Sequence, residues 1–354
     1  MKRLLATILA LVMVFCLAGC GNSSPAATAA PAAAPAAPAD APAAPADVPA
    51  AAPAAAEYVF RIGTTGADGS NYAAGLYKFE ELLEEYSGGR IDVQVYTNST
   101  LGSERDLIEG VGLGTIEMCL SSTGPLPNFS KAFQLLDLPF LFEDHASAFT
   151  FLDSEYGQKI LDSLSSSGIK ALGVWENGFR HITSNFEIKT PEDIKGFTIR
   201  TMENDVHMKA FELAGANPIA MAWGEVYTSL QQGVLDGHEN ALIHIYNYNI
   251  NEVQSHIALT GHFYSPAVIM INADLYNKLP ADLQEAIAKA ELEARTYERE
   301  FSENSDEELV EKLAERGVSI NEVDKSLWRE AMKDTITYFD MDQEAYEYAL
   351  SLSK

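Results

Sequence analysis

Short apolar runs and amphipathic patterns alternate along this chain from residue 58 onward, and this alternation strongly limits its possible folds. Residues 58–63 and 90–96 have the length and apolar character of strands, while residues 69–86 repeat apolar side chains at helical spacing. A helical pattern over 103–113 and an apolar strand over 116–120 follow. This β-α-β-α-β order predicts an α/β fold with a largely parallel sheet and helices on both of its faces.

The rest of the chain continues the alternation. The elements expected there are helices at 145–152, 154–167, 204–214, 223–232, 280–304 and 324–351, and strands at 169–175, 196–201 and 267–272, with a second α/β series beginning at residue 181. The folded part, about 57–354, is long enough to divide into two lobes. Two lobes joined by few crossings, and braced by the long helix at 280–304, would leave a cleft between them for a ligand.

The N-terminus has the pattern of an export signal. Lys2 and Arg3 precede an apolar run over residues 4–17, which is too short to span a bilayer. Residues 17–20 read Leu-Ala-Gly-Cys and resemble the lipobox of bacterial lipoproteins. We therefore expect residues 1–19 to be removed and Cys20 to carry the lipid, palmitate included; an ordinary secretory peptide with an incidental cysteine is the alternative. No later stretch reaches 18 apolar residues, so the mature chain is expected to contact the membrane through its lipid alone.

Residues 21–56 are nearly all Ala and Pro, with eight prolines at irregular spacing. This composition predicts an extended, semi-rigid tether that could reach roughly 100 Å at about 3.1 Å per residue. The formal net charge of the chain is −27. The charges of the signal and the tether cancel, so the folded part carries about the same net charge, which argues against nucleic acid or an anionic membrane surface as a partner.

Patterns of enzymes and metal sites are absent from the sequence. There is no G-x-S-x-G elbow and no P-loop, and the glycines of residues 63–69 have the wrong spacing for a dinucleotide site. His238 and His244 are six residues apart, which would place them on different faces of a helix and not on one face as a zinc motif requires. Cys119 is the one cysteine left in the folded part and is expected in the core, so no disulfide can form within one mature chain. We expect neither an enzyme nor a cofactor.

Two arginines stand out within this acidic sequence. Arg180 follows Asn-Gly-Phe, and Arg200 ends the predicted strand at 196–201. A guanidinium group offers a carboxylate two parallel hydrogen bonds, and the carboxyl end of a strand in an open α/β sheet is where such folds bind ligands. Either arginine could instead pair with a neighbouring carboxylate, and position alone does not separate the two interpretations.

The run over residues 97–266 resembles the solute-binding proteins of TRAP (tripartite ATP-independent periplasmic) transporters, the dicarboxylate-binding type, also called extracellular solute-binding protein family 7. The matching segments are LGSER at 101–105, TPEDIKG at 190–196, GANP at 215–218, MAWGEVY at 221–227 and LQQGVLDGHEN at 230–240, in which His238 replaces the usual glutamine. The resemblance implies a two-lobed periplasmic-binding-protein-like fold (type II-like) that closes on its ligand by a hinge.

The resemblance also implies site residues. Arg200 would be the carboxylate clamp, Arg180 and Asn240 would bind the same carboxylate, and Trp223 would cover the ligand. The positions expected to determine which anion fits are less certain in the family, and they are Asp68 and Tyr72 in the loop at 65–72, Ser121 and Ser122, His244, and His262 in the segment 262–265.

The implied lobes are 57–177 with 266–305, and 178–265 with 306–354. The implied partners are a small organic acid anion and the membrane permease subunits of a TRAP transporter, on the outer side of the cell membrane, for a protein expected to be a monomer. Polar residues around the cleft favour a sugar acid such as glucuronate or galacturonate. A C4-dicarboxylate ligand, and the presentation of ligand to a sensor protein, remain as alternatives.

Overall fold

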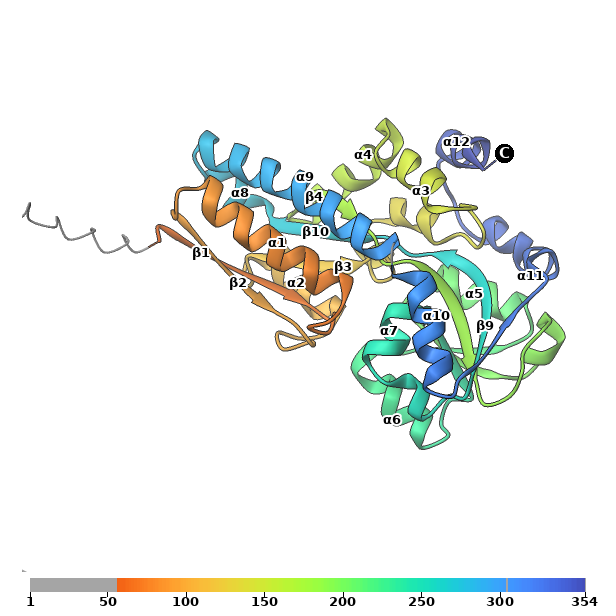
Figure 1. The fold of residues 1–354 in the computed structure, drawn as a ribbon. Helices are drawn as coiled ribbons and strands as arrows, with labels where there is room; N and C mark the ends of the chain where they lie inside the picture. Colours follow the sequence, from red (N-terminus) through yellow and green to blue (C-terminus); the bar gives the residue numbers. More distant parts are fainter. Residues whose placement is uncertain (1–55, 304, 354) are drawn as a thin grey trace, which may run out of the picture. The chain divides into compact units, whose positions relative to one another are not determined.

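Strands β1 (Tyr58–Thr64), β2 (Ile91–Tyr96) and β3 (Met118–Ser122) lie side by side in parallel. Helices α1 (Asn71–Tyr86) and α2 (Glu104–Leu113) connect them. The predicted β-α-β-α-β order is therefore confirmed for this part of the chain, which the bar in Figure 1 colours orange to yellow.

The computed structural model describes residues 56–303 and 305–353. The predicted signal sequence, Cys20 and nearly all of the predicted tether lie outside the described residues. Within the described part, no helix combines the length and the apolar character needed to cross a membrane.

Two strands from later in the chain complete the first sheet, whose order is β2-β1-β3-β10-β4. Strand β10 (Ala267–Asn272) lies between β3 and β4 (Ile169–Trp175) and runs antiparallel to both. The prediction of a largely parallel sheet is wrong here. The chain returns from the other sheet through residues 265–266, so it enters beside the ends of β3 and β4 and must run in the opposite direction.

The second sheet has the order β11-β9-β5-β8-β6-β7 and is also mixed. Strand β5 is antiparallel to both of its neighbours, whereas β6 is parallel to its own. Its strands are β5 (Phe179–Ser184), β6 (Thr198–Thr201), β7 (Asn217–Ala220), β8 (Gly237–Ala241), β9 (His256–Tyr264) and β11 (Ser319–Glu322).

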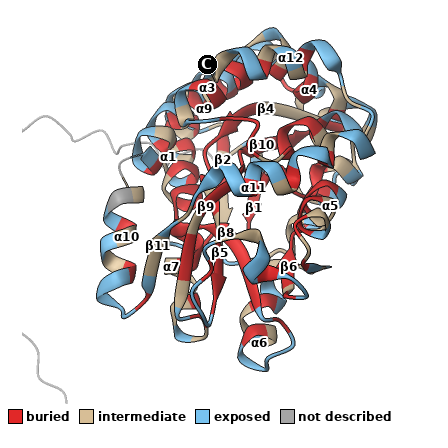
Figure 2. Ribbon diagram, turned by 90° about the vertical axis from the view of Figure 1, so that its right-hand side faces the viewer, coloured by how far each residue is buried: buried red, intermediate tan, exposed pale blue. Residues whose placement is uncertain are grey.

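Shorter helices cover the two sheets, and Figure 2 shows buried strands beneath helices whose outer residues are exposed. The predicted helix at 154–167 ends early and continues as a 3₁₀ segment, and the one at 223–232 begins with a 3₁₀ turn. These helices are α3 (His145–Leu152), α4 (Glu155–Asp162), α5 (Asp205–Leu213), α6 (Val226–Gln231), α7 (Leu242–Asn247) and α8 (Ala273–Lys278).

The long bracing helix is α9 (Ala281–Glu303), and it contacts both lobes, as predicted. It packs along α1 and β4 (Figure 1). Helix α10 (Asp306–Glu315) follows and packs against α7 beside the second sheet. Near the end of α9, Glu298 accepts from the Glu176 backbone N–H at 2.8 Å, so this helix reaches the crossing at residues 176–178.

The predicted continuous helix at 324–351 is wrong. Helix α11 (Lys325–Met332) passes into a 3₁₀ segment over Lys333–Tyr338, and α12 (Gln343–Leu352) begins anew with Asp342 as its N-cap. Helix α11 packs on β9, whereas α12 packs on α3 beside the first sheet. One straight helix cannot make both contacts, so tertiary packing overrides the local helical pattern.

The cores of the two lobes are apolar and closely filled. Trp175 is fully buried against α1 and α9, and Trp328 is fully buried between α11 and the second sheet. Cys119 is fully buried in the first lobe, as predicted, and burial raises the pKa of its thiol far above the usual value. The burial of such apolar side chains away from water is the main contribution to the stability of each lobe.

Candidate ligand-binding site

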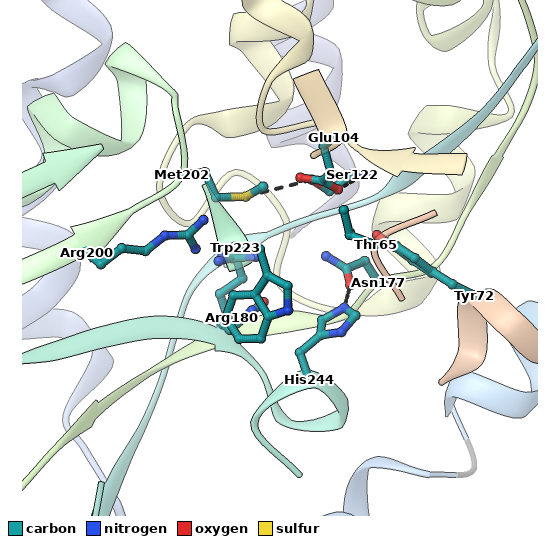
Figure 3. Close-up of a pocket in the computed structure, with 11 residues that line it drawn as sticks. Thr65, Tyr72, Glu104, Ser122, Asn177, Arg180, Arg200, Met202, Trp223 and His244 are labelled. Carbon is teal, nitrogen blue, oxygen red and sulfur yellow. Dashed lines mark hydrogen bonds between the residues drawn. The ribbon is translucent and has the colours of Figure 1, made fainter. Parts of the chain in front are cut away.

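A cavity lies where strand ends and loops of both sheets meet (Figure 3). Its walls combine cationic, acidic, amide and aromatic side chains. The lining residues are Thr65, Tyr72, Glu104, Ser122, Asn177, Arg180, Arg200, Met202, Trp223, Asn240 and His244. The three residues to which the family resemblance assigned the ligand carboxylate, Arg200, Arg180 and Asn240, are all among them, as is Trp223, which would cover the ligand.

Arg200 is 3% exposed near the end of β6. Its Nε and Nη2 atoms donate to the carbonyl oxygen of Met221 at 2.8 and 2.6 Å. Its Nη1 atom has no hydrogen-bond partner among the described residues. Burial, assisted by the charge of Arg180, lowers the pKa of Arg200 to about 10, so the group remains a cation at neutral pH. The backbone contact fixes the guanidinium while leaving its charge available.

Arg180 on β5 is held differently, because it forms a buried ion pair with Glu239 on β8. Its Nε atom lies 2.5 Å from Glu239 Oε2, and Nη2 donates to Glu239 Oε1 at 2.8 Å and to the carbonyl oxygen of the same residue at 2.7 Å. Burial opposes ionisation of Glu239, but Arg180 and His262 outweigh it and hold the pKa of Glu239 well below its usual range. The possibility that Arg180 pairs with a local carboxylate is therefore confirmed, although Arg180 also lines the cavity.

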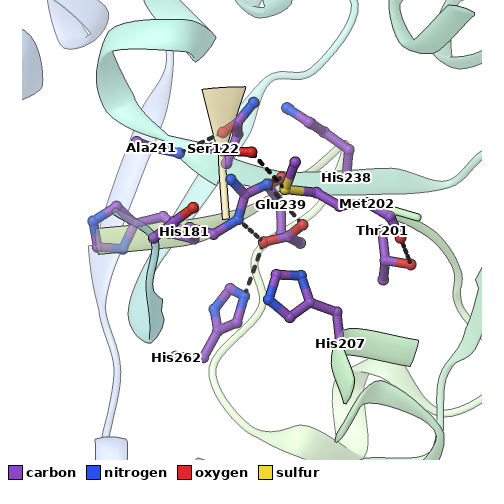
Figure 4. A network of polar contacts seen from close by, with 12 residues as sticks. Ser122, His181, Thr201, Met202, His207, His238, Glu239, Ala241 and His262 are labelled. Atoms are coloured by element: carbon purple, nitrogen blue, oxygen red, sulfur yellow. Dashed lines mark hydrogen bonds and ion pairs between the residues drawn. The ribbon is translucent and has the colours of Figure 1, made fainter. Parts of the chain in front are cut away.

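His262 does not reach the cavity. It lies beside Glu239, with its Nε2 atom 3.3 Å from Glu239 Oε2 and its Nδ1 atom 2.7 Å from Thr260 Oγ1 (Figure 4). His207 stacks on Phe263 in the same layer, with ring centroids 4.0 Å apart. Neither histidine is among the lining residues of the cavity, and His262 contacts the carboxylate that pairs with Arg180.

Asn240 and Trp223 complete this side of the cavity. The Asn240 Oδ1 atom accepts from the backbone N–H of Ala241 at 3.0 Å, which leaves its amide NH₂ directed toward the cavity. The Trp223 ring lies 5.7 Å from the Arg200 guanidinium and meets the Tyr248 ring edge-on at 5.0 Å. This cation–π contact favours a position of the indole ring over the Arg200 guanidinium group.

Glu104 stands on the opposite wall, at the start of α2. Its two oxygens accept from the Ser122 backbone N–H at 2.8 Å and the Ser122 hydroxyl at 3.0 Å. Burial raises the pKa of Glu104, and the hydrogen bonds from Ser122 oppose that rise. Glu104 belongs to the LGSER segment, but the sequence did not indicate that it lines the site. Its position as the first residue after the helix cap Ser103 could have indicated this.

Tyr72 and His244 face each other at the end of the cavity away from Arg200 (Figure 3). Their rings meet edge-on at 5.5 Å. The His244 Nε2 atom lies 2.5 Å from Asn177 Oδ1, and burial, with the charge of Arg180, lowers the pKa of His244 to about 3. The prediction that these two residues and Ser122 belong to the site agrees with their place in its lining, whereas Ser121 is not among the lining residues.

Asp68 does not line the cavity. It is exposed, and its Oδ1 atom accepts from Thr97 Oγ1 at 2.5 Å and from the Tyr77 hydroxyl at 3.3 Å. The predicted loop contributes Thr65 and Tyr72 instead, because the chain turns at Gly66 and the helix cap Ser70 directs α1 inward. Asn177 and Met202 are further lining residues that the sequence did not single out.

The two lobes touch around the cavity. The Tyr248 hydroxyl donates to the carbonyl oxygen of Thr65, and Asn128 Nδ2 donates to the carbonyl oxygen of Glu203 at 3.0 Å. The Ser122 hydroxyl lies 3.8 Å from the Met202 sulfur. These contacts join the first sheet's loops to those of the second, so the cavity has walls from both lobes.

Comparisons of the sequence and of the structure with known proteins all point to solute-binding proteins. Residues 62–342 match the family described as bacterial extracellular solute-binding protein, family 7. A 2,3-diketo-L-gulonate-binding periplasmic protein from Escherichia coli is 35% identical, over 80% of this chain and 86% of the relative.

Two crystal structures of TRAP-type and sugar-acid-binding proteins show the same fold. A sugar acid binding protein from Advenella mimigardefordensis in complex with galactonate has a TM-score of 0.81 and 31% identity, covering 85% of this chain and 99% of that one. A TRAP periplasmic solute-binding protein from Sulfurospirillum deleyianum with bound succinate has a TM-score of 0.80 and 30% identity, covering 84% and 99%. This chain therefore belongs to family 7 of the bacterial extracellular solute-binding proteins, the extracytoplasmic solute-binding proteins of TRAP transporters, which bind small carboxylates and are not enzymes.

Proposed function

We propose that this protein captures a sugar acid, a monocarboxylate carrying several hydroxyl groups, and delivers it to a TRAP permease. The ligand carboxylate binds Arg200, with Arg180 and the Asn240 amide beside it, and Trp223 covers it. Closure of the two lobes buries this ion pair, which strengthens the attraction by lowering the local dielectric constant.

The observation that carries this choice of ligand is the distribution of charge around the cavity. Arg200 is the lining arginine without a carboxylate partner among the described residues, since Arg180 is paired with Glu239. Glu104 adds a carboxyl group on the opposite wall. One free cation facing one carboxyl group suits a ligand with a single negative charge and hydroxyl groups that donate to Glu104.

A C4-dicarboxylate is the rival, because the Sulfurospirillum relative is described with bound succinate. Its second carboxylate would need a second cationic group at the far end of the cavity. The residues at that end are Thr65, Tyr72, Asn177 and His244, with Glu104 along one side, and none of these lining side chains is a lysine or an arginine. The Escherichia coli relative and the Advenella structure, by contrast, are named for sugar acids.

The test is calorimetric titration of the purified protein with galactonate, erythronate, galacturonate, glucuronate, succinate and malate. We expect at least one sugar acid to bind roughly tenfold or more tightly than either dicarboxylate. Tight binding of succinate or malate with no binding of the sugar acids would contradict the proposal.

Glu104→Gln sharpens the comparison. The amide can still accept from the Ser122 N–H and donate to its hydroxyl, but the negative charge is gone. We expect the affinity for succinate relative to galactonate to rise about tenfold, since a like charge facing the second carboxylate is removed. Glu109→Gln, on the exposed face of the same helix, is the matched control and should leave this ratio unchanged.

We also propose that Cys20 carries a lipid and that residues 21–56 tether the two lobes to the membrane. We propose that the lobes comprise 57–177 with 266–305, and 178–265 with 306–354 except α12, which packs on α3 of the first lobe. The prediction is that the wild-type protein sediments with membranes and incorporates labelled palmitate. Cys20→Ala should release it, and a variant that still sediments and labels would refute the anchor.

A further inference from the structure

The Tyr72 side chain has an unusual environment for a tyrosine. It is 1% exposed, and its hydroxyl oxygen is buried without a hydrogen-bond partner among the described residues. Burying a hydroxyl group in this state is costly, and most buried hydroxyl groups are paired. Because Tyr72 also lines the cavity, the missing partner is expected in the ligand.

His244 offers the complementary group. Asn177 Nδ2 donates to Ser265 Oγ at 3.1 Å, which directs Asn177 Oδ1 toward His244 as an acceptor. His244 Nε2 must then carry the proton that it donates. The ring is neutral at physiological pH because its pKa lies near 3, so Nδ1 keeps a free lone pair. Among the described residues, no donor contacts that Nδ1.

The two groups lie at the same end of the cavity. The rings of Tyr72 and His244 are in edge contact at 5.5 Å, on the side of Thr65 and Asn177 and away from Arg200 (Figure 3). A tyrosine hydroxyl donates readily, and an unprotonated imidazole nitrogen accepts only. One donor and one acceptor together match a single alcohol, which accepts with its oxygen and donates with its hydrogen.

We infer that Tyr72 and His244 form a hydroxyl-recognition pair that binds one alcohol group of the ligand, at the end opposite its carboxylate. This inference rests on the proposed function, because it assumes a hydroxylated monocarboxylate. It assigns the preference for a hydroxyl over a second carboxylate to specific atoms. A carboxylate placed there would accept from Tyr72 but would bring its oxygens against the His244 lone pair.

The pair also reaches the crossings between the lobes. His244 contacts Asn177, and Asn177 contacts Ser265. The hydroxyl-recognition pair is therefore linked by hydrogen bonds to both segments that connect the sheets, β4 to β5 and β9 to β10. A ligand hydroxyl bound by His244 therefore tightens a chain of hydrogen bonds that ends at the hinge.

The experiment compares Tyr72→Phe with the wild-type protein, using calorimetry with galactonate and with its singly deoxygenated analogues. We expect Tyr72→Phe to lower the affinity for galactonate about tenfold. The same substitution should change little for the one analogue that lacks the recognised hydroxyl. The ligand-free melting temperature should be unchanged or higher, because the substitution removes a buried unpaired hydroxyl.

His244→Asn, tested in parallel, should lower galactonate affinity by a similar factor and show the same loss of effect with the same analogue. Equal losses on every analogue, or unchanged galactonate binding in Tyr72→Phe, would overturn the pair while the proposed function stands. A wild-type protein that binds succinate but no sugar acid would overturn the proposed function, and the pair with it.

Discussion

Arg200 differs from Arg180 in what neutralises it, although both are buried arginines in the same cavity. The partner of Arg200 is the carbonyl oxygen of Met221, a dipole without net charge, whereas Arg180 has the full charge of Glu239. A ligand carboxylate therefore gains more from Arg200 than from Arg180. We therefore propose that Arg200 binds the ligand carboxylate and that Arg180 shapes the pocket around it.

Arg200→Ala is expected to abolish tight binding with the fold intact. Truncation leaves the buried ligand carboxylate without its free cation, which should cost about 3–5 kcal/mol, or about two to four decades in affinity. Calorimetry measures the loss, and the melting temperature confirms folding. Arg329→Ala is the control, since Arg329 is exposed and pairs with Glu143 on the surface. Binding by Arg200→Ala within threefold of wild type would reject the assignment.

At the level of single residues, the sequence predicted the carboxylate side of the cavity better than its far end. Arg200, Arg180, Asn240 and Trp223 carry over from motifs of fixed spacing, and all of them line the cavity. The prediction that Asp68 belongs to the site rested only on its position in the loop at 65–72, and Asp68 does not line the cavity. Whether a loop side chain turns inward depends on tertiary packing, which a single sequence does not display.

Among the elements, helix α9 carries a buried acid into the region of the hinge. Glu298 is fully buried, accepts from Asn71 Nδ2 at 2.8 Å and from the Glu176 backbone N–H at 2.8 Å, and contacts Ser302 at 3.1 Å. Glu176 itself is fully buried and accepts from the Tyr264 hydroxyl at 2.6 Å. Two acids thus meet where the chain passes between lobes. Burial raises the pKa of Glu298 to about 8.

This raised pKa predicts a pH dependence of stability. The folded-state pKa of Glu298, about 8, lies above its value of about 4.5 in an unfolded chain. The contribution of Glu298 to stability is therefore complete below about pH 4.5 and declines as the pH rises through 8, by up to about 1.4 kcal/mol per pH unit. Urea unfolding at pH 5, 7 and 9 should show this decline in wild type and lack it in Glu298→Gln.

Comparing the two proteins at each pH cancels the titration of the other groups. Glu285→Gln, an exposed residue of the same helix, should follow the wild-type profile. A constant difference between wild type and Glu298→Gln from pH 5 to pH 9 would mean that Glu298 is ionised throughout.

Strands β8 and β7 were not predicted because neither shows apolar alternation, and the reason differs between them. Strand β8 reads Gly-His-Glu-Asn-Ala, and its polar side chains are buried because each has a partner or faces the cavity, so no apolar alternation marks it. Strand β7 is mostly exposed at an edge. The helices and the strands of the first sheet were predictable because apolar periodicity alone sets their faces. The direction of β10 and the break before α12 depend on contacts between distant parts of the chain.

For the whole molecule, the formal charge of −27 works against an anionic ligand at long range. Only the local field of the cavity is favourable, and it acts within a short distance. Salt screens the long-range repulsion more than the buried ion pair, since the Debye length is about 8 Å at physiological ionic strength.

The association rate constant for a sugar acid should therefore increase with salt, about two- to fivefold between 10 and 150 mM NaCl. Stopped-flow measurement of tryptophan fluorescence can report it, because Trp223 lines the cavity. The dissociation rate constant serves as the internal control and should change less. A rate of association that falls with salt would show that the cationic cavity steers the ligand in spite of the acidic surface.

One of the contacts that join the two lobes around the cavity, the hydrogen bond from the Tyr248 hydroxyl, uses the carbonyl oxygen of Thr65 and not its side chain. Every amino acid has that oxygen, so a substitution at position 65 leaves the Tyr248 bond available. The Thr65 side chain, however, is part of the cavity wall. A substitution at position 65 can therefore change which ligand fits without removing the hydrogen bond between the lobes. The protein could acquire a new ligand preference at this position and still close to the same extent.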